Sequence, residues 1–422
     1  MISSRVWETP RAPDRTEIGQ TEKPAGTWSV ATFDCSQDQR SLGLGAIAGA
    51  LASVLEGTHM TSKSVKLTAA CMLVGSIVGW QAPAIAGSDA SSDTYAGDYQ
   101  GGSLPTGTFI ALQYAGFAHS NSFIDTAGNA VPNSHANVWE EFTRFAYFSQ
   151  LFGHPLVIEA EVPFATLTDV NLPIPGSNNS VHSGATDPVF HLTYFFIADA
   201  KVQRWLGFTD YVYLPLGRYN PADTINVATP HQTTDVPQIG YTEGLGKFSP
   251  ALNGVFFDLV ANASFHSNGK DPIFSPAVAT GVPVLGTAPG FAIFDTLTQK
   301  PSYDVKAFLR YEPKPLQFIA LGIEKSWGGE QIATNGRFAS ALVGPLSPFN
   351  FVAPLANESL SKDDYLRGHV EFQFPLAQDL ALGGDIFHDF DRVGGFKDDF
   401  GIELRLTKFF FPARPSSSML TK

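Results

Sequence analysis

The chain has 422 residues with 40 acidic and 27 basic side chains, which gives a formal net charge of −13. A chain this acidic lacks the basic surface that nucleic-acid binding requires, so we expect no nucleic-acid partner. Both cysteines, Cys35 and Cys71, lie within the first 86 residues, so the rest of the chain has neither a disulfide framework nor a cysteine-based metal site.

Residues 60–86, MTSKSVKLTAACMLVGSIVGWQAPAIA, have the three parts of a secretory signal. Two lysines follow a methionine, an apolar run extends over 67–79, and the segment closes on the small-x-small sequence Ala84-Ile85-Ala86. We therefore predict a signal peptide at 60–86 and a mature chain from Gly87. Residues 1–59 are then an over-extended N-terminus that is not part of the fold. The alternative is an internal hydrophobic core segment.

The chain after Gly87 contains no run of about 20 apolar residues, so no helix is expected to span a membrane. Its apolar and polar side chains alternate with a period of two, which predicts strands with two different faces. In YLRGHVEFQF, residues 365–374, Val370 and Phe372 share one face, while His369 and Glu371 share the other. Both a soluble all-β protein and an outer-membrane barrel show such alternation.

Loop lengths favour the barrel, because short connections such as 313–314 alternate with long ones such as 218–234, ending with a shorter one at 390–396. Short periplasmic turns and long extracellular loops are typical of outer-membrane barrels. Twelve strands are expected, near 106–118, 137–149, 155–168, 184–198, 203–217, 235–247, 254–266, 301–312, 315–327, 363–375, 379–389 and 397–411.

We predict an all-β fold over residues 106–411: a transmembrane, antiparallel, up-and-down β-barrel of about 12 strands in the bacterial outer membrane. Residues 87–105 are expected as a periplasmic N-terminal segment, and 412–422 as a periplasmic tail. The longest loops, 267–300 and 328–362, are apolar and proline-rich, so we expect them to cover the extracellular mouth or pack into it. A further hairpin within them would give 14 strands as the alternative.

Aromatic residues near the strand ends are expected to form interface girdles at the two membrane surfaces. They include Trp139, Phe148, Tyr194, Trp205, Tyr213, Trp327 and the run Phe409 to Phe411.

The last expected strand contains DFGIELRL, residues 399–406, which is polar-x-Gly-x-x-apolar-x-apolar. This pattern resembles the C-terminal signal by which the outer-membrane assembly machinery recognises its clients. We therefore expect that machinery as a partner, together with outer-membrane lipid and lipopolysaccharide.

Two further segments carry a family resemblance. SGATDPVFHLTYFF at 183–196 resembles a Gly-rich, Gly-Asp-containing strand start, although Thr186 stands where Gly would precede Asp187. YVYLPLGRY at 211–219 resembles a strand that ends in Pro-x-Gly. With the layout of 100–411, these segments are similar to the outer-membrane family named for the MetA pathway of phenol degradation. The resemblance implies a barrel and a path for small molecules.

The polar strand faces supply the candidate site residues. Mixed charges in a narrow lumen make either a selectivity constriction or a salt-bridged network that holds the barrel shut, and both readings stay open. The lumen-facing candidates are Glu159, Glu161, Asp258, Lys306, Arg310, Arg367, His369, Glu371, Asp385, Glu403 and Arg405.

No catalytic motif stands out in the mature sequence, and we expect no enzyme, no cofactor and no metal site. His388 and Asp389 are adjacent in a strand and so face opposite ways. Ser264 and His266 share a face, but we expect them to be ordinary pore lining, because a nucleophile also needs an oxyanion partner. We predict a channel or transporter for passive passage of small, hydrophobic or aromatic, molecules. The alternatives are a barrel enzyme acting on lipid and a structural or adhesive barrel.

Overall fold

The computed structural model describes residues 94–173, 182–220, 226–229, 231–269, 273–276, 290–340, 352–354 and 358–412. The predicted leader, the signal peptide and most of the C-terminal tail lie outside the described residues. Within the described part, no helix is long and apolar enough to cross a membrane.

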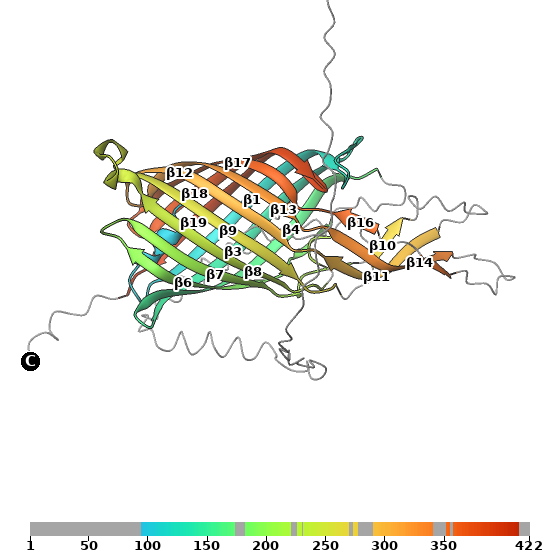
Figure 1. The fold of residues 1–422 in the computed structure, drawn as a ribbon, viewed down its shortest axis with the longest axis horizontal. Coiled ribbons are helices and arrows are strands. Elements are labelled where there is room, and N and C mark those ends of the chain that lie inside the picture. The colour runs from blue at the N-terminus through green and yellow to red at the C-terminus, as the bar shows by residue number, and fades with distance from the viewer. Residues whose placement is uncertain are drawn as a thin grey trace, which may run out of the picture. The chain divides into compact units, whose positions relative to one another are not determined.

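Twelve antiparallel strands form a closed barrel, which confirms the predicted fold and strand number (Figure 1). Each strand pairs with the next, and the last pairs with the first from Phe109↔Phe410 to Ile124↔Gly395. Closure satisfies the backbone groups that an open edge would leave unpaired in hydrocarbon. The strands are β1 (Phe109–Ile124), β3 (His135–Leu151), β4 (His154–Asn171), β6 (Val189–Asp199), β7 (Arg204–Tyr213), β8 (Thr234–Gly244), β9 (Val255–His266), β12 (Ser302–Lys314), β13 (Gln317–Gly328), β17 (Asp364–Ala377), β18 (Leu380–Val393) and β19 (Gly395–Phe410).

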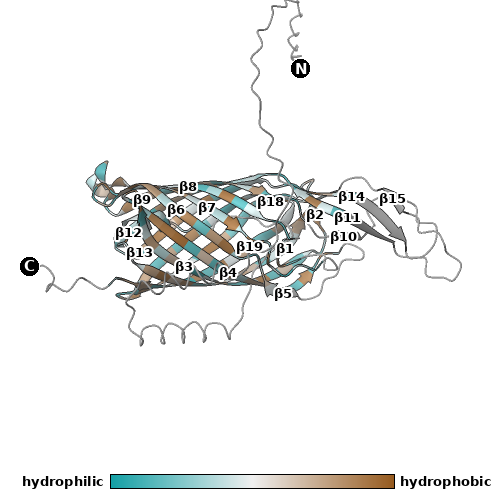
Figure 2. Ribbon diagram, turned by 90° about the horizontal axis from the view of Figure 1, so that it is seen from below, coloured by the Kyte–Doolittle hydropathy of each residue, from teal (hydrophilic) through white to brown (hydrophobic). Residues whose placement is uncertain are grey.

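Strand alternation sorts the side chains between the outer surface and the lumen. On β12, Leu309 is 54% exposed and its neighbour Arg310 is 1% exposed. On β19, Leu404 is 41% exposed and Arg405 is 4% exposed. The same alternation of apolar and polar residues runs along the barrel strands in Figure 2. The outer face is therefore largely apolar, as contact with lipid requires.

Short turns close the end of the barrel where β1 starts and β19 ends. Phe152 and Gly153 join β3 to β4 with φ of 52° and 83°, as in the type I′ turns that suit twisted hairpins. At the opposite end, β18 and β19 extend further than expected. They are joined through Gly394, whose φ is 83°, so the predicted loop at 390–396 is a tight hairpin instead.

The two longest predicted loops contain strands that do not enter the barrel wall. β10 (Ile273–Pro276), β11 (Gly290–Gln299), β14 (Gln331–Ser340), β15 (Val352–Pro354) and β16 (Glu358–Ser361) form a second sheet. β11 leads directly into β12, and β14 follows β13, so the β11–β14 pair continues the β12–β13 hairpin past the barrel end (Figure 1). The described parts of these loops thus extend a hairpin rather than cover the mouth, and the barrel keeps twelve strands.

Two short strands complete the extracellular side. β2 (Ala130–Val131) pairs with the end of β1, and β5 (His182–Ala185) pairs with the upper part of β4. β6 pairs with β4 only from Leu156 to Glu161, and β5 pairs with β4 beyond that point, from Phe164 to Leu167.

Candidate functional site

A segment of the chain before β1 lies inside the barrel. It contains the short 3-10 helix η1 (Asp98–Ser103), and its side chains Tyr95 and Tyr99 are each 5% exposed. We call residues 94–103 the plug segment. From the sequence, we expected residues 87–105 in the periplasm. It lies in the lumen instead, where its two tyrosines and the backbone N–H of Ala96 bond to the inward strand faces.

The plug segment is hydrogen-bonded to the wall formed by β17 and β19. Ala96 N donates to Glu371 Oε2 at 2.7 Å, and the Tyr95 hydroxyl donates to Glu403. Arg405 Nη1 donates to Asp98 Oδ1 at 2.8 Å, and its guanidinium lies 4.1 Å from the centre of the Tyr95 ring.

Tyr99 reaches the opposite wall. Its hydroxyl lies 2.8 Å from Thr209 Oγ1 on β7, and Gln238 Nε2 on β8 donates to it at 3.0 Å. A Cβ on Gly240 would stand only 1.9 Å from the Tyr99 ring, and one on Gly207 only 2.9 Å. The two inward-facing glycines therefore create the space that Tyr99 fills. Because both walls hold it, the plug segment crosses the lumen.

Burial acts on the phenols of the plug segment. It raises the pKa of Tyr99 to about 12. It also raises the pKa of Tyr95 well above the ordinary value, and the nearby Glu403 carboxylate adds to that shift. Both phenols therefore stay protonated at neutral pH and can donate hydrogen bonds to the wall.

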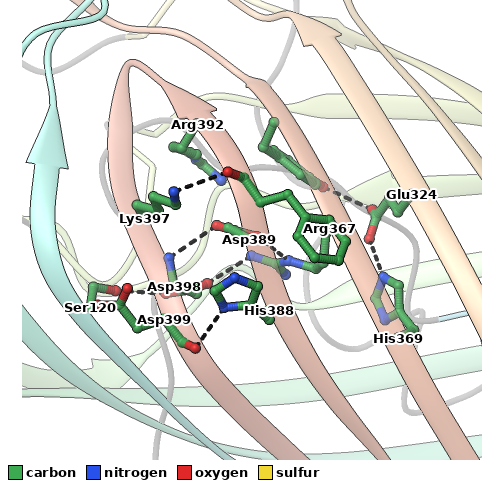
Figure 3. Close-up of polar contacts among 12 residues, drawn as sticks. Ser120, Glu324, Arg367, His369, His388, Asp389, Arg392, Lys397, Asp398 and Asp399 are labelled. Atoms are coloured by element: carbon green, nitrogen blue, oxygen red, sulfur yellow. Dashed lines mark hydrogen bonds and ion pairs between the residues drawn. The ribbon is translucent and has the colours of Figure 1, made fainter.

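On the extracellular side of the plug segment, charged groups form a network centred on His369. Its Nδ1 lies 2.8 Å from Asp385 Oδ2, and its Nε2 lies 2.9 Å from Glu324 Oε2 (Figure 3). Lys306 Nζ lies 3.4 Å from Glu324 Oε1. His369, Glu371 and Asp385 offer ligand atoms within 4.8 Å of one another. Since carboxylates already hold both imidazole nitrogens, the arrangement is that of a protonated histidine in an ion-pair network.

A second network lies nearer the extracellular end. Arg367 bridges Asp389 and Asp398, with Nε···Oδ1 at 2.6 Å and Nη2···Oδ2 at 2.7 Å, and Ser120 Oγ donates to Asp398 at 2.6 Å (Figure 3). His388 points to the other side of β18 and bonds to the backbone oxygen of Asp399. The opposite orientation of His388 and Asp389 agrees with the strand parity.

On the periplasmic side, Arg310 Nε donates to Asp258 Oδ2 at 3.0 Å. Across the barrel, Glu161 pairs with Arg144 and lies 2.8 Å from His191 Nε2. All eleven sequence-predicted residues lie on the enclosed side of the barrel, and most belong to one of these networks. Glu159 makes a longer contact, with its Oε1 3.5 Å from His191 Nδ1.

Sequence reasoning missed several partners of these residues. Arg144, His191 and Glu324 share the inward parity of their strands, so the period-two rule could have found them. The sequence around Tyr95 and Tyr99 shows no strand or helix period, and nothing in it marked them as lumen residues. Ser264 and His266 do share a face, but His266 Nδ1 lies 3.0 Å from Thr234 Oγ1.

The plug segment lies between two cavities. One, of about 280 Å³, lies toward the extracellular end and is lined by the His369 and Arg367 networks. The other, of about 510 Å³, lies toward the periplasmic end and is mainly apolar. Three residues expected in the outer aromatic girdle, Phe148, Trp205 and Phe409, are buried along this second cavity instead. They point inward because their positions have lumen parity.

A buried aspartate holds the extracellular loop between β7 and β8 in place. Asp187 accepts hydrogen bonds from Gly217 N at 2.9 Å and from the backbone N–H of Thr229 at 3.2 Å. A Cβ on Gly217 would lie 2.4 Å from that of Ala228, so only glycine fits. The next residue back, Val227, packs in a buried cluster with residues of β1, β3 and β4. The described part of this loop enters the barrel, whereas the described strands of the two longest loops form the second sheet.

Asp187 and Gly217 also join the two family-like segments at 183–196 and 211–219. Residues 120–331, just over half of the chain, match the model of the family described as "Putative MetA-pathway of phenol degradation". The chain belongs to this family. In this member, the two segments pair along β6 and β7, and the hydrogen bond from Gly217 to Asp187 anchors an inward-folded loop.

Solved structures resemble this family member in fold. An outer membrane channel from Pseudomonas putida F1 has 19% sequence identity and a TM-score of 0.58, covering 75% of this chain and 100% of that one. The Pseudomonas putida toluene transporter TodX has 7% identity and a TM-score of 0.38, covering 78% of this chain and 94% of that one, a similarity too low to support a conclusion. No curated protein matches the chain.

Proposed function

We propose that this chain is an outer-membrane channel for the passive passage of small molecules, with hydrophobic and aromatic molecules as its preferred solutes. The observation that carries the proposal is the pair of cavities on either side of the plug segment. Both cavities lie inside the barrel, and a purely structural barrel does not need them. Displacement of the plug segment would join them.

The lining of the periplasmic cavity supports the choice of solute. Phe148, Phe195 and Trp205 line one side and Phe256 and Phe318 another, and a few polar groups lie among them. Cavities of this kind bind small apolar molecules through aromatic contact, and the polar groups fix their orientation. The family's link to phenol degradation and the fold similarity to an outer membrane channel point the same way.

The eleven predicted lumen residues then form a lining that favours neutral solutes over ions. Each cation lies near carboxylates, so the networks neutralise one another and leave no uniform field for an ion to follow. A neutral solute crosses such a lining more easily than an ion that must break an ion pair.

Uptake measurements test the proposal. Cells that produce the protein should take up a labelled monoaromatic compound, such as phenol, faster than cells without it. The rate should rise linearly with concentration and should not depend on the proton-motive force. Equal uptake in both cell types would reject the proposal. Lipid hydrolysis by the purified protein, lost in Ser264→Ala, would favour the enzyme alternative.

A further inference from the structure

A group of polar side chains lies on the outer, lipid-facing side of β1 and β3. Gln113 Nε2 donates to Glu141 Oε1 at 2.9 Å, and Thr143 Oγ1 donates to Gln113 Oε1 at 2.6 Å. We call Gln113, Glu141 and Thr143 the outer polar patch. Their neighbours Phe142 and Arg144 are buried on the lumen side, so strand alternation places the patch outside.

The strand register places the outer polar patch inside the apolar band. Gln113 lies between Thr143 and Leu406 of β19, and Glu141 lies beside Phe164 of β4. Leu406 and Phe164 are exposed on the outer surface, at 41% and 44%. The surroundings of the patch on both sides are therefore lipid-facing.

Along the strands, an aromatic pair lies on each side of the outer polar patch. Phe117 contacts Trp139 toward the extracellular end, with ring centres 4.4 Å apart. Phe109 stacks on Phe145 toward the periplasmic end, at 6.0 Å. Such aromatic rows mark the edges of the apolar band. A carboxyl group, that of Glu141, thus lies at hydrocarbon depth.

Glu141 is exceptional among the described strands. The other Asp, Glu, Lys and Arg side chains on the outer face lie closer to strand ends, as do Asp210, Asp235 and Lys408, whereas Glu141 lies well inside β3. Each of the ten other barrel strands exposes at least one large apolar side chain. β1 exposes none, and β3 exposes only Leu151 at its turn. An ionisable residue at membrane depth is costly and normally faces protein rather than lipid.

We propose that the outer polar patch is the contact surface for a second copy of this chain within the membrane. The three side chains already bond to one another, and a copy related by a two-fold axis would place the same polar surface against them in place of lipid. Ala111 and Ala115 flank Gln113 on the same face, and small side chains allow two walls to approach closely. Lipid chains offer no hydrogen bonds, so this contact stabilises the patch.

Cysteine cross-linking in native membranes tests the proposal. With Cys35 and Cys71 changed to serine, Ala115→Cys places one thiol beside the patch, and Leu309→Cys places one on β12 across the barrel as the matched control. Mild oxidation should give a dimer from Ala115→Cys and little from Leu309→Cys. Equal cross-linking of both variants, or cross-linking of Ala115→Cys to a different protein, would overturn the proposal.

Substitutions within the outer polar patch separate a specific contact from crowding. Adding Glu141→Leu and Gln113→Leu to Ala115→Cys should lower the dimer fraction about tenfold, whereas Glu141→Gln, which keeps the hydrogen bonds, should preserve it. Slower migration after heating in detergent gels shows that each barrel is folded. An unchanged dimer fraction in the double leucine variant contradicts the proposal, as does a purely monomeric wild type in native mass spectrometry.

Discussion

At the scale of single residues, Leu404 and Arg405 show how parity sets the consequence of a change. Leu404 faces lipid, where an arginine costs about 2–4 kcal/mol near the membrane midplane. Arg405 lies in the lumen and bonds to Asp98 and Gln373. We predict that Leu404→Arg cripples assembly, while Arg405→Leu gives a folded barrel with a loosened plug segment. Heat-modifiable gel mobility reports folding, and equal damage from both changes would contradict the assigned faces.

Tyr99 supplies a pH-dependent signature of the plug segment. Its folded pKa of about 12 exceeds the ordinary value of 10.0. Stability from the protonated phenol is therefore complete below pH 10 and is lost as pH rises through about 12. In an ultraviolet titration, the difference between wild type and Tyr99→Phe should be one tyrosine that ionises near pH 12. A difference step near pH 10 would mean that Tyr99 is exposed to water.

At the scale of elements, the strands could be predicted because each carries a period-two pattern. On β12 and β17, adjacent residues such as Leu309 and Arg310 were correctly assigned to opposite faces of the wall. The plug segment could not be predicted, because DYQGGS has no period and its site depends on the absence of side chains at Gly207 and Gly240. Likewise, Asp187 bonds to Gly217, which lies 30 residues away. The two motifs could be recognised in the sequence, but their contact could not be predicted from it.

The loop between β7 and β8 depends on Asp187. Asp187→Ala leaves Gly217 N–H and Thr229 without their acceptor, which costs about 1–3 kcal/mol for each buried group. We predict faster proteolysis within 214–233 and noisier channel currents. The exposed Asp235→Ala is the matched control and should change neither. Protease resistance equal to that of wild type would show that the loop is held by other contacts.

The second sheet is separable from the barrel wall. β12 and β13 pair along their whole length without help from β11 and β14. Replacing residues 269–297 and 332–359 by short linkers should therefore leave a folded, heat-modifiable barrel. Loss of the barrel in this variant would mean that the second sheet contributes to wall stability.

At the scale of the whole molecule, a closed barrel with an apolar outer face and a charged interior is an outer-membrane structure. In the conformation described, the plug segment and Val227 of the loop between β7 and β8 both occupy the interior. As a channel, the barrel needs this interior to become a path when the plug segment moves, with the charge networks lining that path without closing it.

Single-channel conductance in planar bilayers tests this claim most directly. Wild-type barrels should show a small, intermittent conductance. Barrels that lack residues 87–104 should show a larger, sustained one, because the cavities of about 280 and 510 Å³ then join. A barrel with Gln150→Ala, a change at an exposed residue near the end of β3, serves as the control and should match wild type. If the folded deletion variant conducts no better than wild type, the lumen is closed by its own side chains, and the account of a plugged channel is wrong.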